Sequence, residues 1–306
     1  MAEQSPTPTQ AEGRSARGAG DALPAGRREF RFERSHFDFI AGLLYRLTGI
    51  SLAPHKVEMM YSRLARRLRE LGLPDFDAYC ARLESDKAED EVRFLVNALT
   101  TNLTSFFREH HHFEHLGKAV VPVVREAQAH QSPPRLRIWS AGCSSGPEPY
   151  TIAMVLCHAI PDLRRWDARI LATDIDTHMV ATARRGVYPA ESQKTIPPEM
   201  RERFTKRVKD PQGEPEITMA DELRRLITFK PLNLLEPWPM RGPFDAIFCR
   251  NVLIYFDRPG RMAVIEKYAG LLPPGGFLYL GHSESLYGVS GSFEQVGATI
   301  YRRTGR

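Results

Sequence analysis

The sequence has few cysteines, no long apolar run and no strong excess of either charge. No apolar run approaches the roughly 20 residues needed to span a bilayer, and the N-terminal residues lack the apolar core of a signal peptide. We therefore expect a cytoplasmic protein that does not insert into a membrane. The cysteines form no CxxC pair, which argues against a disulfide framework or a zinc site and favours buried free thiols: Cys80, Cys143, Cys157 and Cys249.

The composition that remains is typical of a globular protein. The chain of 306 residues is long enough for two domains and a sizeable core, with 42% hydrophobic and 26% charged residues. Its net charge of +5 permits nucleic-acid binding without indicating it, and suits an acidic protein partner equally well. Motifs, rather than composition, must identify the function.

The N-terminal part of the chain divides into a tail, a helical region and a linker. Residues 1–28 have almost no large apolar side chains and cannot bury enough surface to fold, so we expect a disordered tail. Residues 29–116 show helical periodicity and predict an α-helical domain. Residues 117–134, which become polar and end in prolines, predict a linker to a second domain.

One predicted helix of this region has an apolar stripe on one side and basic residues on the other. The basic side includes Arg63, Arg66 and Arg67. A solvated charged face is the usual explanation for such a pattern. An acidic helical partner is the alternative, because only Glu58 and Glu70 balance the basic residues of this helix.

Residues 100–109 interrupt the helical pattern: polar and β-branched residues come first, and two Phe, an Arg and a Glu end the segment. Its Asn and Thr residues either cap the neighbouring helices or present side chains to a ligand. Histidines follow at positions 110, 111, 112 and 115, but no carboxylate or thiol partner stands at ligand spacing. We expect no metal site there.

Residues 135–151, RLRIWSAGCSSGPEPYT, are the stretch around which the second domain is organised. An apolar run leads into a loop of small residues containing Gly142 and Gly146, and Pro147 then opens an apolar helical segment. Strand, tight turn and helix in this order predict the first unit of a nucleotide-binding α/β domain. Any strand-to-helix turn remains the alternative for this stretch alone.

Further strands alternate with helices along the rest of the chain. Buried strands are predicted at 169–174, 227–232, 244–249 and 277–280, and this alternation predicts a mostly parallel sheet. Residues 187–224 break the alternation, and predict an insertion with short strands at 204–208 and 216–219. A final antiparallel pair is expected at 293–296 and 299–303.

Polar residues follow the ends of the predicted strands. They are Asp174, Asn233, Arg250 and Asn251. Because the carboxyl ends of parallel strands meet at one edge of a sheet, we expect a ligand site there. An acidic residue at the end of the second strand, such as Asp174, hydrogen-bonds ribose hydroxyls in this fold class, although a lone Asp at that point also commonly caps a helix.

The glycine spacing distinguishes between cofactors. An NAD site requires G-x-G-x-x-G, whereas this loop has one Gly and then another four residues on. The final antiparallel pair is instead typical of S-adenosylmethionine-dependent methyltransferases, by analogy of fold.

Several separated blocks of the sequence match the pattern of one protein family. They are residues 61–69, Thr100–Glu109, Trp139–Tyr150, Ala172–Thr177, Asn233–Leu235, Phe244–Asp257 and Gly281–Glu284. In these blocks and in their order, the chain resembles the chemotaxis receptor methyltransferase family (CheR), which methylates glutamate side chains on chemoreceptor signalling helices. The resemblance implies an α/β fold: a Rossmann-like methyltransferase domain over residues 135–306, a small β-subdomain inserted near 190–224, and an α-helical N-terminal domain.

The resemblance also implies a site. Its cofactor is S-adenosylmethionine, with S-adenosylhomocysteine as product, and the cofactor-binding residues are Asn102, Thr104, Arg108, Gly142, Glu148, Asp174, Asn233, Leu234, Arg250 and Asn251. Arg108 and Tyr255 face the methyl transfer as catalytic residues. Arg63, Arg66 and Arg67 dock on the cytoplasmic signalling domains of chemoreceptors, whose C-terminal tails bind the β-subdomain in some relatives. The expected protein is a monomer that binds no nucleic acid and no metal.

The chemistry of the acceptor agrees with this site. A glutamate carboxylate has an ordinary pKa of about 4.3, so it is already ionised at neutral pH and needs no general base. Arg250-Asn251-Val252-Leu253 stands where amine methylases carry Asn/Asp-Pro-Pro-aromatic. Two alternatives fit the same residues: a methyltransferase acting on RNA or a small molecule, and a non-enzymatic cofactor sensor or scaffold.

Overall fold

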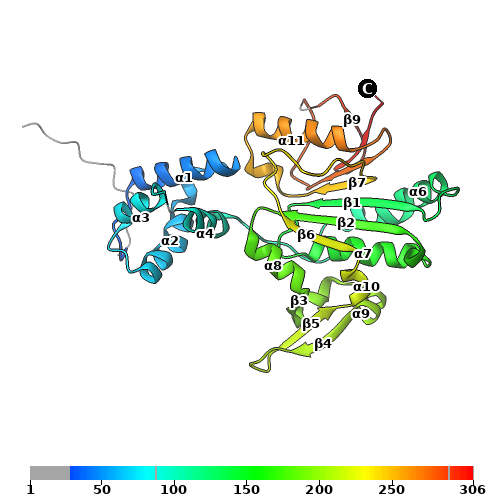
Figure 1. Ribbon diagram of the computed structural model, residues 1–306, viewed down its shortest axis with the longest axis horizontal. Helices are drawn as coiled ribbons and strands as arrows, with labels where there is room; N and C mark the ends of the chain where they lie inside the picture. Colours follow the sequence, from blue (N-terminus) through cyan, green and yellow to red (C-terminus); the bar gives the residue numbers. More distant parts are fainter. Residues whose placement is uncertain (1–27, 87, 289, 306) are drawn as a thin grey trace, which may run out of the picture.

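The computed structural model describes residues 28–86, 88–288 and 290–305. Apart from Arg28, the tail expected over residues 1–28 lies outside these residues. Figure 1 shows a cluster of helices at one end of the molecule and a large sheet, covered by helices on both faces, in the remainder.

The N-terminal cluster contains α1 (Arg34–Thr48), α2 (Val57–Leu71), α3 (Phe76–Leu83) and α4 (Glu89–Leu99), with a short 3-10 turn η1 (Pro54–Lys56) before α2. The helices α1 and α2 end at Gly49 and Gly72, whose φ angles of 71° and 65° lie in the left-handed region that glycine adopts readily. Asp75 starts α3 by accepting a hydrogen bond from the Ala78 amide (2.8 Å). The apolar faces of these helices form a core of their own, which includes Ile40, Leu64, Phe76 and Leu95.

The large sheet has seven strands in the order β6-β2-β1-β7-β8-β10-β9. Their bounds are β1 Arg135–Ala141, β2 Asp167–Asp174, β6 Ile227–Pro231, β7 Ala246–Cys249, β8 Phe277–Leu280, β9 Phe293–Gly297 and β10 Ile300–Arg303. The first five strands of this order pair in parallel, and β10 runs antiparallel to β8 and β9. This arrangement confirms the predicted α/β methyltransferase fold, including its final antiparallel pair.

Apolar cores lie on both faces of this sheet. On one face, α7 (Pro147–Ala159) and α8 (Thr177–Arg185) pack with α5 (His111–His115), the π-helix η2 (Leu116–Val120) and α6 (Val121–Ala127). On the other face, α11 (Arg258–Leu271) covers Trp139 and Ile247. Because α7 is enclosed between the sheet and its neighbours, it is apolar nearly all round.

Residues 117–134 are not a linker over their first part, which corrects the sequence-based expectation. They continue α5 through η2 and α6, and Leu116, Val120 and Val124 are buried against the sheet. Pro122 is compatible with this helical run, because it lies in the first turn of α6, directly after η2.

The insertion forms a small antiparallel sheet with the strand order β3-β5-β4. Its strands are β3 (Val187–Pro189), β4 (Thr205–Lys209) and β5 (Pro215–Met219), with η4 (Ala190–Thr195), α9 (Pro198–Phe204) and α10 (Asp221–Arg224) around them. The short 3-10 helices η3 (Leu163–Arg165) and η5 (Leu253–Tyr255) complete the described elements. None of the helices described here is both long enough and apolar enough to cross a bilayer.

Candidate active site

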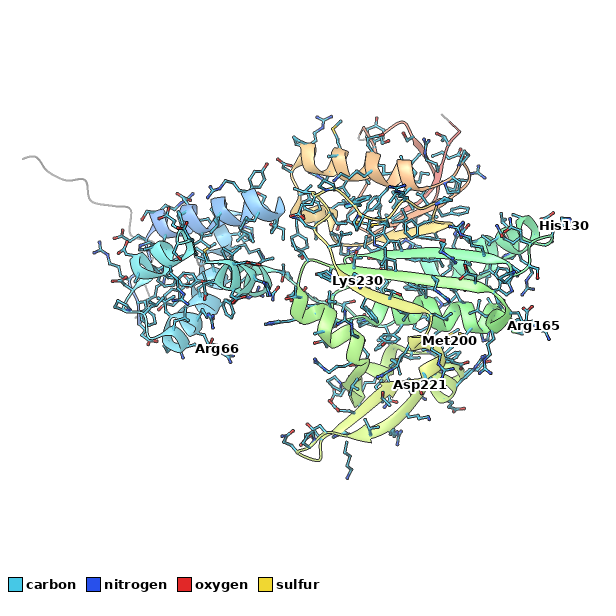
Figure 2. All side chains as sticks on the ribbon, in the orientation of Figure 1. Arg66, His130, Arg165, Met200, Asp221 and Lys230 are labelled. Atoms are coloured by element: carbon cyan, nitrogen blue, oxygen red, sulfur yellow. The ribbon has the colours of Figure 1, made fainter. Side chains whose placement is uncertain are left out.

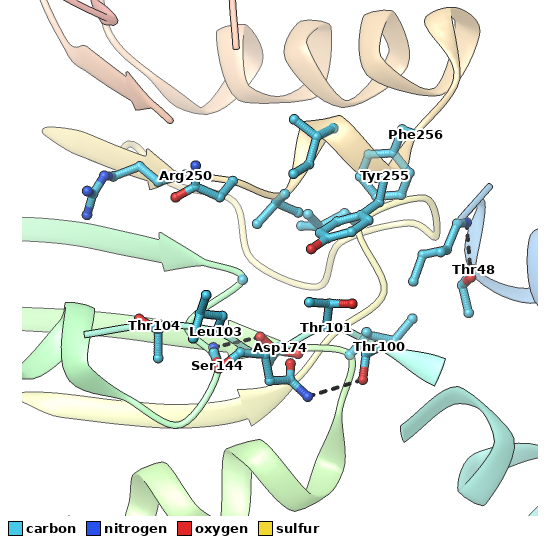
Figure 3. A pocket seen from close by; sticks show the side chains of 18 of the residues that line it. Thr48, Thr100, Thr101, Leu103, Thr104, Ser144, Asp174, Arg250, Tyr255 and Phe256 are labelled. Atoms are coloured by element: carbon cyan, nitrogen blue, oxygen red, sulfur yellow. Dashed lines mark hydrogen bonds between the residues drawn. The ribbon is translucent and has the colours of Figure 1, made fainter. Parts of the chain in front are cut away.

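A cavity of about 570 Å³ lies where the carboxyl ends of the parallel strands meet the N-terminal helices. Figure 3 shows its walls from close by. Every residue that the sequence predicted at the cofactor or at the methyl transfer lines this one cavity: Asn102, Thr104, Arg108, Gly142, Glu148, Asp174, Asn233, Leu234, Arg250, Asn251 and Tyr255. The structure therefore brings together side chains that are up to 153 positions apart in the sequence, from Asn102 to Tyr255.

The loop after β1 is shaped by backbone constraints. Gly142 has a φ of 86°, and its amide donates to the carbonyl oxygen of Thr173 at the end of β2 (2.8 Å). A Cβ atom at position 142 would lie only 2.3 Å from Cγ2 of Val252, so no larger residue fits there. The loop then enters α7 through Gly146 and Pro147, as the strand–turn–helix pattern predicts.

Asp174 ends β2 and is only 9% exposed. Its Oδ2 accepts a hydrogen bond from the Ser144 amide (2.7 Å), and its Oδ1 accepts one from the Asp176 amide (2.9 Å). Burial raises the pKa of Asp174 to about 6, although these two amides oppose the shift. The helix cap is Asp176, which accepts from the amides of His178 and Met179, so Asp174 keeps its place at the cavity.

Glu148 and Arg250 form a buried ion pair beside the loop. Arg250 Nη1 donates to Glu148 Oε2 (3.0 Å), and Ser140 Oγ donates to Glu148 Oε1 (2.7 Å). Burial raises the pKa of Glu148, whereas Arg250 and Ser140 oppose that shift. In the wall of the cavity, the pair joins α7 to the residue that follows β7.

Arg108 and Tyr255 reach the cavity from opposite parts of the chain. Arg108 is half-buried, and its Nη1 donates to the carbonyl oxygen of Leu103 (3.0 Å). Tyr255 ends η5 and packs against the N-terminal helical core, and its carbonyl oxygen accepts from the Ser51 amide (2.9 Å). Both side chains therefore border a space that the N-terminal helices help to close.

Several wall residues were missed by the sequence reasoning. The N-terminal helices and the connection after α1 contribute wall residues to the cavity: Thr48, Ile50, Ser51, Lys56 and Met59. Nothing in their helical periodicity signals this role, because it depends on how the helices sit against the sheet. Asn233 marks that contact, since its Nδ2 donates to the carbonyl oxygen of Leu47 (2.8 Å).

Glu284 is a second omission. It is 6% exposed and accepts hydrogen bonds from the amides of Gly281 (2.6 Å), Asn251 (2.9 Å) and Ile254 (3.2 Å). It thus fixes the segment after β7, in which Asn251 has a φ of 60°. A Gly followed three residues later by a Glu directly after a buried strand was the available signal.

The arginines of α2 do not form one free basic face, because Arg63 and Arg67 have partners within the chain. Arg63 donates to the carbonyl oxygens of Ala98 and Thr100 (2.8 Å each), and so caps the end of α4. Arg67 pairs with the buried Glu91 through two hydrogen bonds of 3.0 and 2.8 Å. Arg66 alone of the three is largely exposed, and Figure 2 shows it at the outer edge of the helical cluster.

The residues that the structure describes contain no group of three or more His, Cys, Asp or Glu side chains placed to hold a metal ion. The histidines after Arg108 have other partners. His115 Nδ1 lies 2.9 Å from the Tyr279 hydroxyl, and His112 Nε2 lies 3.0 Å from Thr299 Oγ1. Burial, together with the charge of Arg250, lowers the pKa of His112 to about 3 and keeps its imidazole neutral.

The polar groups and the volume of the cavity fit S-adenosylmethionine. A carboxylate at the end of the second strand suits ribose hydroxyls, and the volume of about 570 Å³ lies within the range of small-molecule sites. Together with the sheet order and its terminal antiparallel pair, these features define an S-adenosylmethionine-dependent methyltransferase.

Comparison with known families identifies the particular group. Residues 35–100 match the model of the CheR methyltransferase all-alpha domain, and residues 102–302 match that of the CheR methyltransferase SAM binding domain. The chain belongs to the CheR family of chemotaxis methyltransferases. The family, the enzyme class and the cofactor predicted from the sequence are thus confirmed.

The similarity to individual relatives extends over most of the length of each of them. The chain is 44% identical to the probable chemotaxis protein methyltransferase of Rhizobium etli over 263 residues, 86% of this chain and 97% of that protein. It is 44% identical to chemotaxis protein methyltransferase 2 of Pseudomonas aeruginosa over 277 residues, 90% of this chain and 95% of that protein. It is 42% identical to the chemotaxis protein methyltransferase of Escherichia coli over 269 residues, 87% of this chain and 90% of that protein.

Proposed function

We propose that this enzyme methylates glutamate side-chain carboxylates on the cytoplasmic signalling helices of chemoreceptors, giving glutamate methyl esters and S-adenosylhomocysteine. The observation that carries the proposal is the position of Arg108 and Tyr255 in the same cavity as the loop after β1 and Asp174. A cation and a hydroxyl donor suit an acceptor that is an anion. Adaptation in chemotaxis signalling would be the role of this reaction, in the cytoplasm.

The cofactor side of the cavity would be formed by the loop after β1 and the strand ends. Asp174 would accept from ribose hydroxyls, and Asn233 and Leu234 would border the base. The buried pair of Glu148 and Arg250 would hold the loop and β7 in register. When bound, S-adenosylmethionine supplies an electrophilic methyl group on a sulfonium.

The acceptor side requires positioning rather than proton transfer. At neutral pH the glutamate is ionised, so its oxygen takes the methyl group and no proton changes hands. Arg108 would hold the carboxylate through a charge-assisted hydrogen bond, and the Tyr255 hydroxyl would orient it. A single-point grip by Arg108 leaves the second oxygen of the carboxylate free to react. Opposite charges disappear in the reaction, so exclusion of water by the cavity walls favours it.

The receptor itself would dock beside the cavity. The first turn of α2 lines the cavity through Met59, so a partner helix lying along α2 comes close to Arg108. Arg66 would attract an acidic helix over a long range. Among the residues that the structure describes, the strand β4 pairs only with β5, and its outer edge would accept a receptor tail as an added strand.

A transfer assay with labelled S-adenosylmethionine tests this function. The acceptors are receptor cytoplasmic fragments, with and without their C-terminal tails, and total RNA. We expect label on the receptor fragments that is released by alkali, as a carboxyl ester is. Label on RNA, or label on protein that resists alkali, would overturn the proposal, and cofactor binding without any transfer would indicate a sensor.

A further inference from the structure

The turn that carries Arg108 has an unusual backbone. Phe107 and Glu109, the residues on either side of Arg108, have φ angles of 55° and 56°, in the left-handed region that non-glycine residues seldom adopt. Such conformations persist only where the surrounding structure holds them. On the Phe107 side, the ring is buried beside Phe113, and the amide donates to Thr151 Oγ1 (3.2 Å).

On the other side, the carboxylate of Glu109 holds the turn. Its Oε2 lies 3.4 Å from Arg250 Nη2, and its Oε1 lies 3.2 Å from His282 Nδ1 and 3.3 Å from the His282 amide. Its side chain is 11% exposed. Burial raises the pKa of Glu109, but the charge of Arg250 and the hydrogen bonds from His282 outweigh burial and leave that pKa below its usual value. Glu109 is therefore an anion at neutral pH.

Arg250 connects this anion to the backbone of Arg108. The same Nη2 that faces Glu109 also donates to the carbonyl oxygen of Arg108, while Nη1 is held by Glu148. The guanidinium thus lies between α7 and the turn, with its position set on both sides by a carboxylate. Without the negative charge of Glu109, Arg250 would keep Glu148 and lose its ionic contact with the turn.

We propose that Glu109 is a positioning residue for methyl transfer: through Arg250 and its own backbone, it fixes Arg108 at the acceptor side of the cavity. The proposal rests on the function proposed above for Arg108. Glu109 does not line the cavity, so it acts on the acceptor through Arg108 rather than by contact. Its contact with His282, which does line the cavity, extends the same constraint to the segment after β8.

The central test is a double-mutant cycle between positions 108 and 109. Glu109→Gln keeps the shape of the side chain and removes its charge, and Arg108→Lys keeps a cation so that turnover stays measurable. We expect Glu109→Gln to lower kcat about tenfold in the wild-type background and less than about twofold in the Arg108→Lys background, because the two residues act as a unit. Glu109→Asp should recover part of the loss.

A second readout separates positioning from general damage to the fold. Calorimetric binding of S-adenosylhomocysteine to Glu109→Gln should stay within about threefold of wild type. The matched control is Glu114→Gln, because Glu114 is an exposed glutamate of α5 outside the cavity, and it should leave kcat unchanged. A loss of S-adenosylhomocysteine affinity as large as the loss of kcat would mean that Glu109 supports the fold of the cofactor site, and would overturn the inference.

The remaining outcomes distinguish the inference from the function on which it rests. If Glu109→Gln lowers kcat equally in both backgrounds, or not at all while Arg108→Ala is inactive, the positioning role fails and the proposed function stands. If Arg108→Ala turns over like wild type, the proposed role of Arg108 fails, and the positioning role fails with it.

Discussion

The ion pair partners around Arg250 and those around Arg66 on α2 differ in their solvent exposure. At the cavity, the side chain of Arg250 is 3% exposed, and its carboxylate partners Glu109 and Glu148 are 11% and 10% exposed. On α2, the side chain of Arg66 is 79% exposed, and its partner Glu70 is 42% exposed. Loss of one partner of a buried ion pair leaves an uncompensated buried charge and strongly destabilises the fold. An exposed ion pair contributes little to stability, and its side chains remain available to other molecules.

Removing Arg250 should give the largest effect and sharpen this contrast. Arg250→Ala leaves Glu148 and Glu109 buried without their cation, which we expect to lower the free energy of unfolding by about 3–5 kcal/mol. Arg66→Ala should lower it by less than about 0.5 kcal/mol. Urea denaturation of both variants measures the difference, and equal losses would remove the contrast between the two regions.

Arg108→Ala should leave stability nearly unchanged and act on turnover. If the guanidinium holds the acceptor carboxylate, its loss should lower kcat about 100-fold, as does the loss of a single preorganised donor in other enzymes. S-adenosylhomocysteine affinity should fall by less than about threefold. Single-turnover methylation and calorimetry measure the two quantities. A large loss of S-adenosylhomocysteine affinity with little loss of kcat would assign Arg108 to cofactor binding instead.

Arg67 lies on α2 but belongs with the buried charges. Its partner Glu91 is only 3% exposed, and the other nearby cation, Arg82, lies 3.7 Å away. Arg67→Ala should therefore lower the free energy of unfolding by about 2 kcal/mol, because Glu91 loses two charge-assisted hydrogen bonds. Glu91→Gln introduced together with Arg67→Met should restore part of it. Stability unchanged in Arg67→Ala would return Arg67 to the exposed face.

The two regions also differ in how far the sequence could predict them. At the cavity, strand ends converge by the geometry of a parallel sheet, so Gly142, Asp174 and Asn251 could be placed together without coordinates. On α2, periodicity shows which side is basic but not which helix packs there. The burial of Glu91, a residue of α4 that pairs with Arg67 of α2, was therefore invisible. The fold class followed from alternation of strands and helices, whereas the helical residues 117–127 were assigned to a linker because the stretch up to residue 134 becomes polar and ends in prolines.

The buried carboxyl of Asp174 should make ligand binding in the cavity sensitive to pH. Its pKa is about 6, and ribose hydroxyls would bind its ionised form. The affinity for S-adenosylhomocysteine should therefore be constant above about pH 7, and should fall up to about tenfold per unit as the pH drops below 6 and the carboxylate takes up a proton. Calorimetry across pH 5–8 measures this. Asp174→Asn should bind weakly with a flat profile, and an equal slope in that variant would assign the titration to another group.

The smallest effect is expected at Arg66, where only long-range attraction is at stake. Arg66→Glu should raise KM for an acidic receptor fragment about threefold at low ionic strength, with kcat unchanged. This difference should vanish in 0.5 M salt, where a Debye length of roughly 4 Å screens exposed charges. Arg125→Glu is the matched control. Arg125 is an exposed arginine of α6, which lies at the opposite end of the molecule from α2 (Figure 1). If both variants raise KM alike, the net charge of the protein rather than the α2 surface governs receptor docking, and the position of an exposed charge does not affect it.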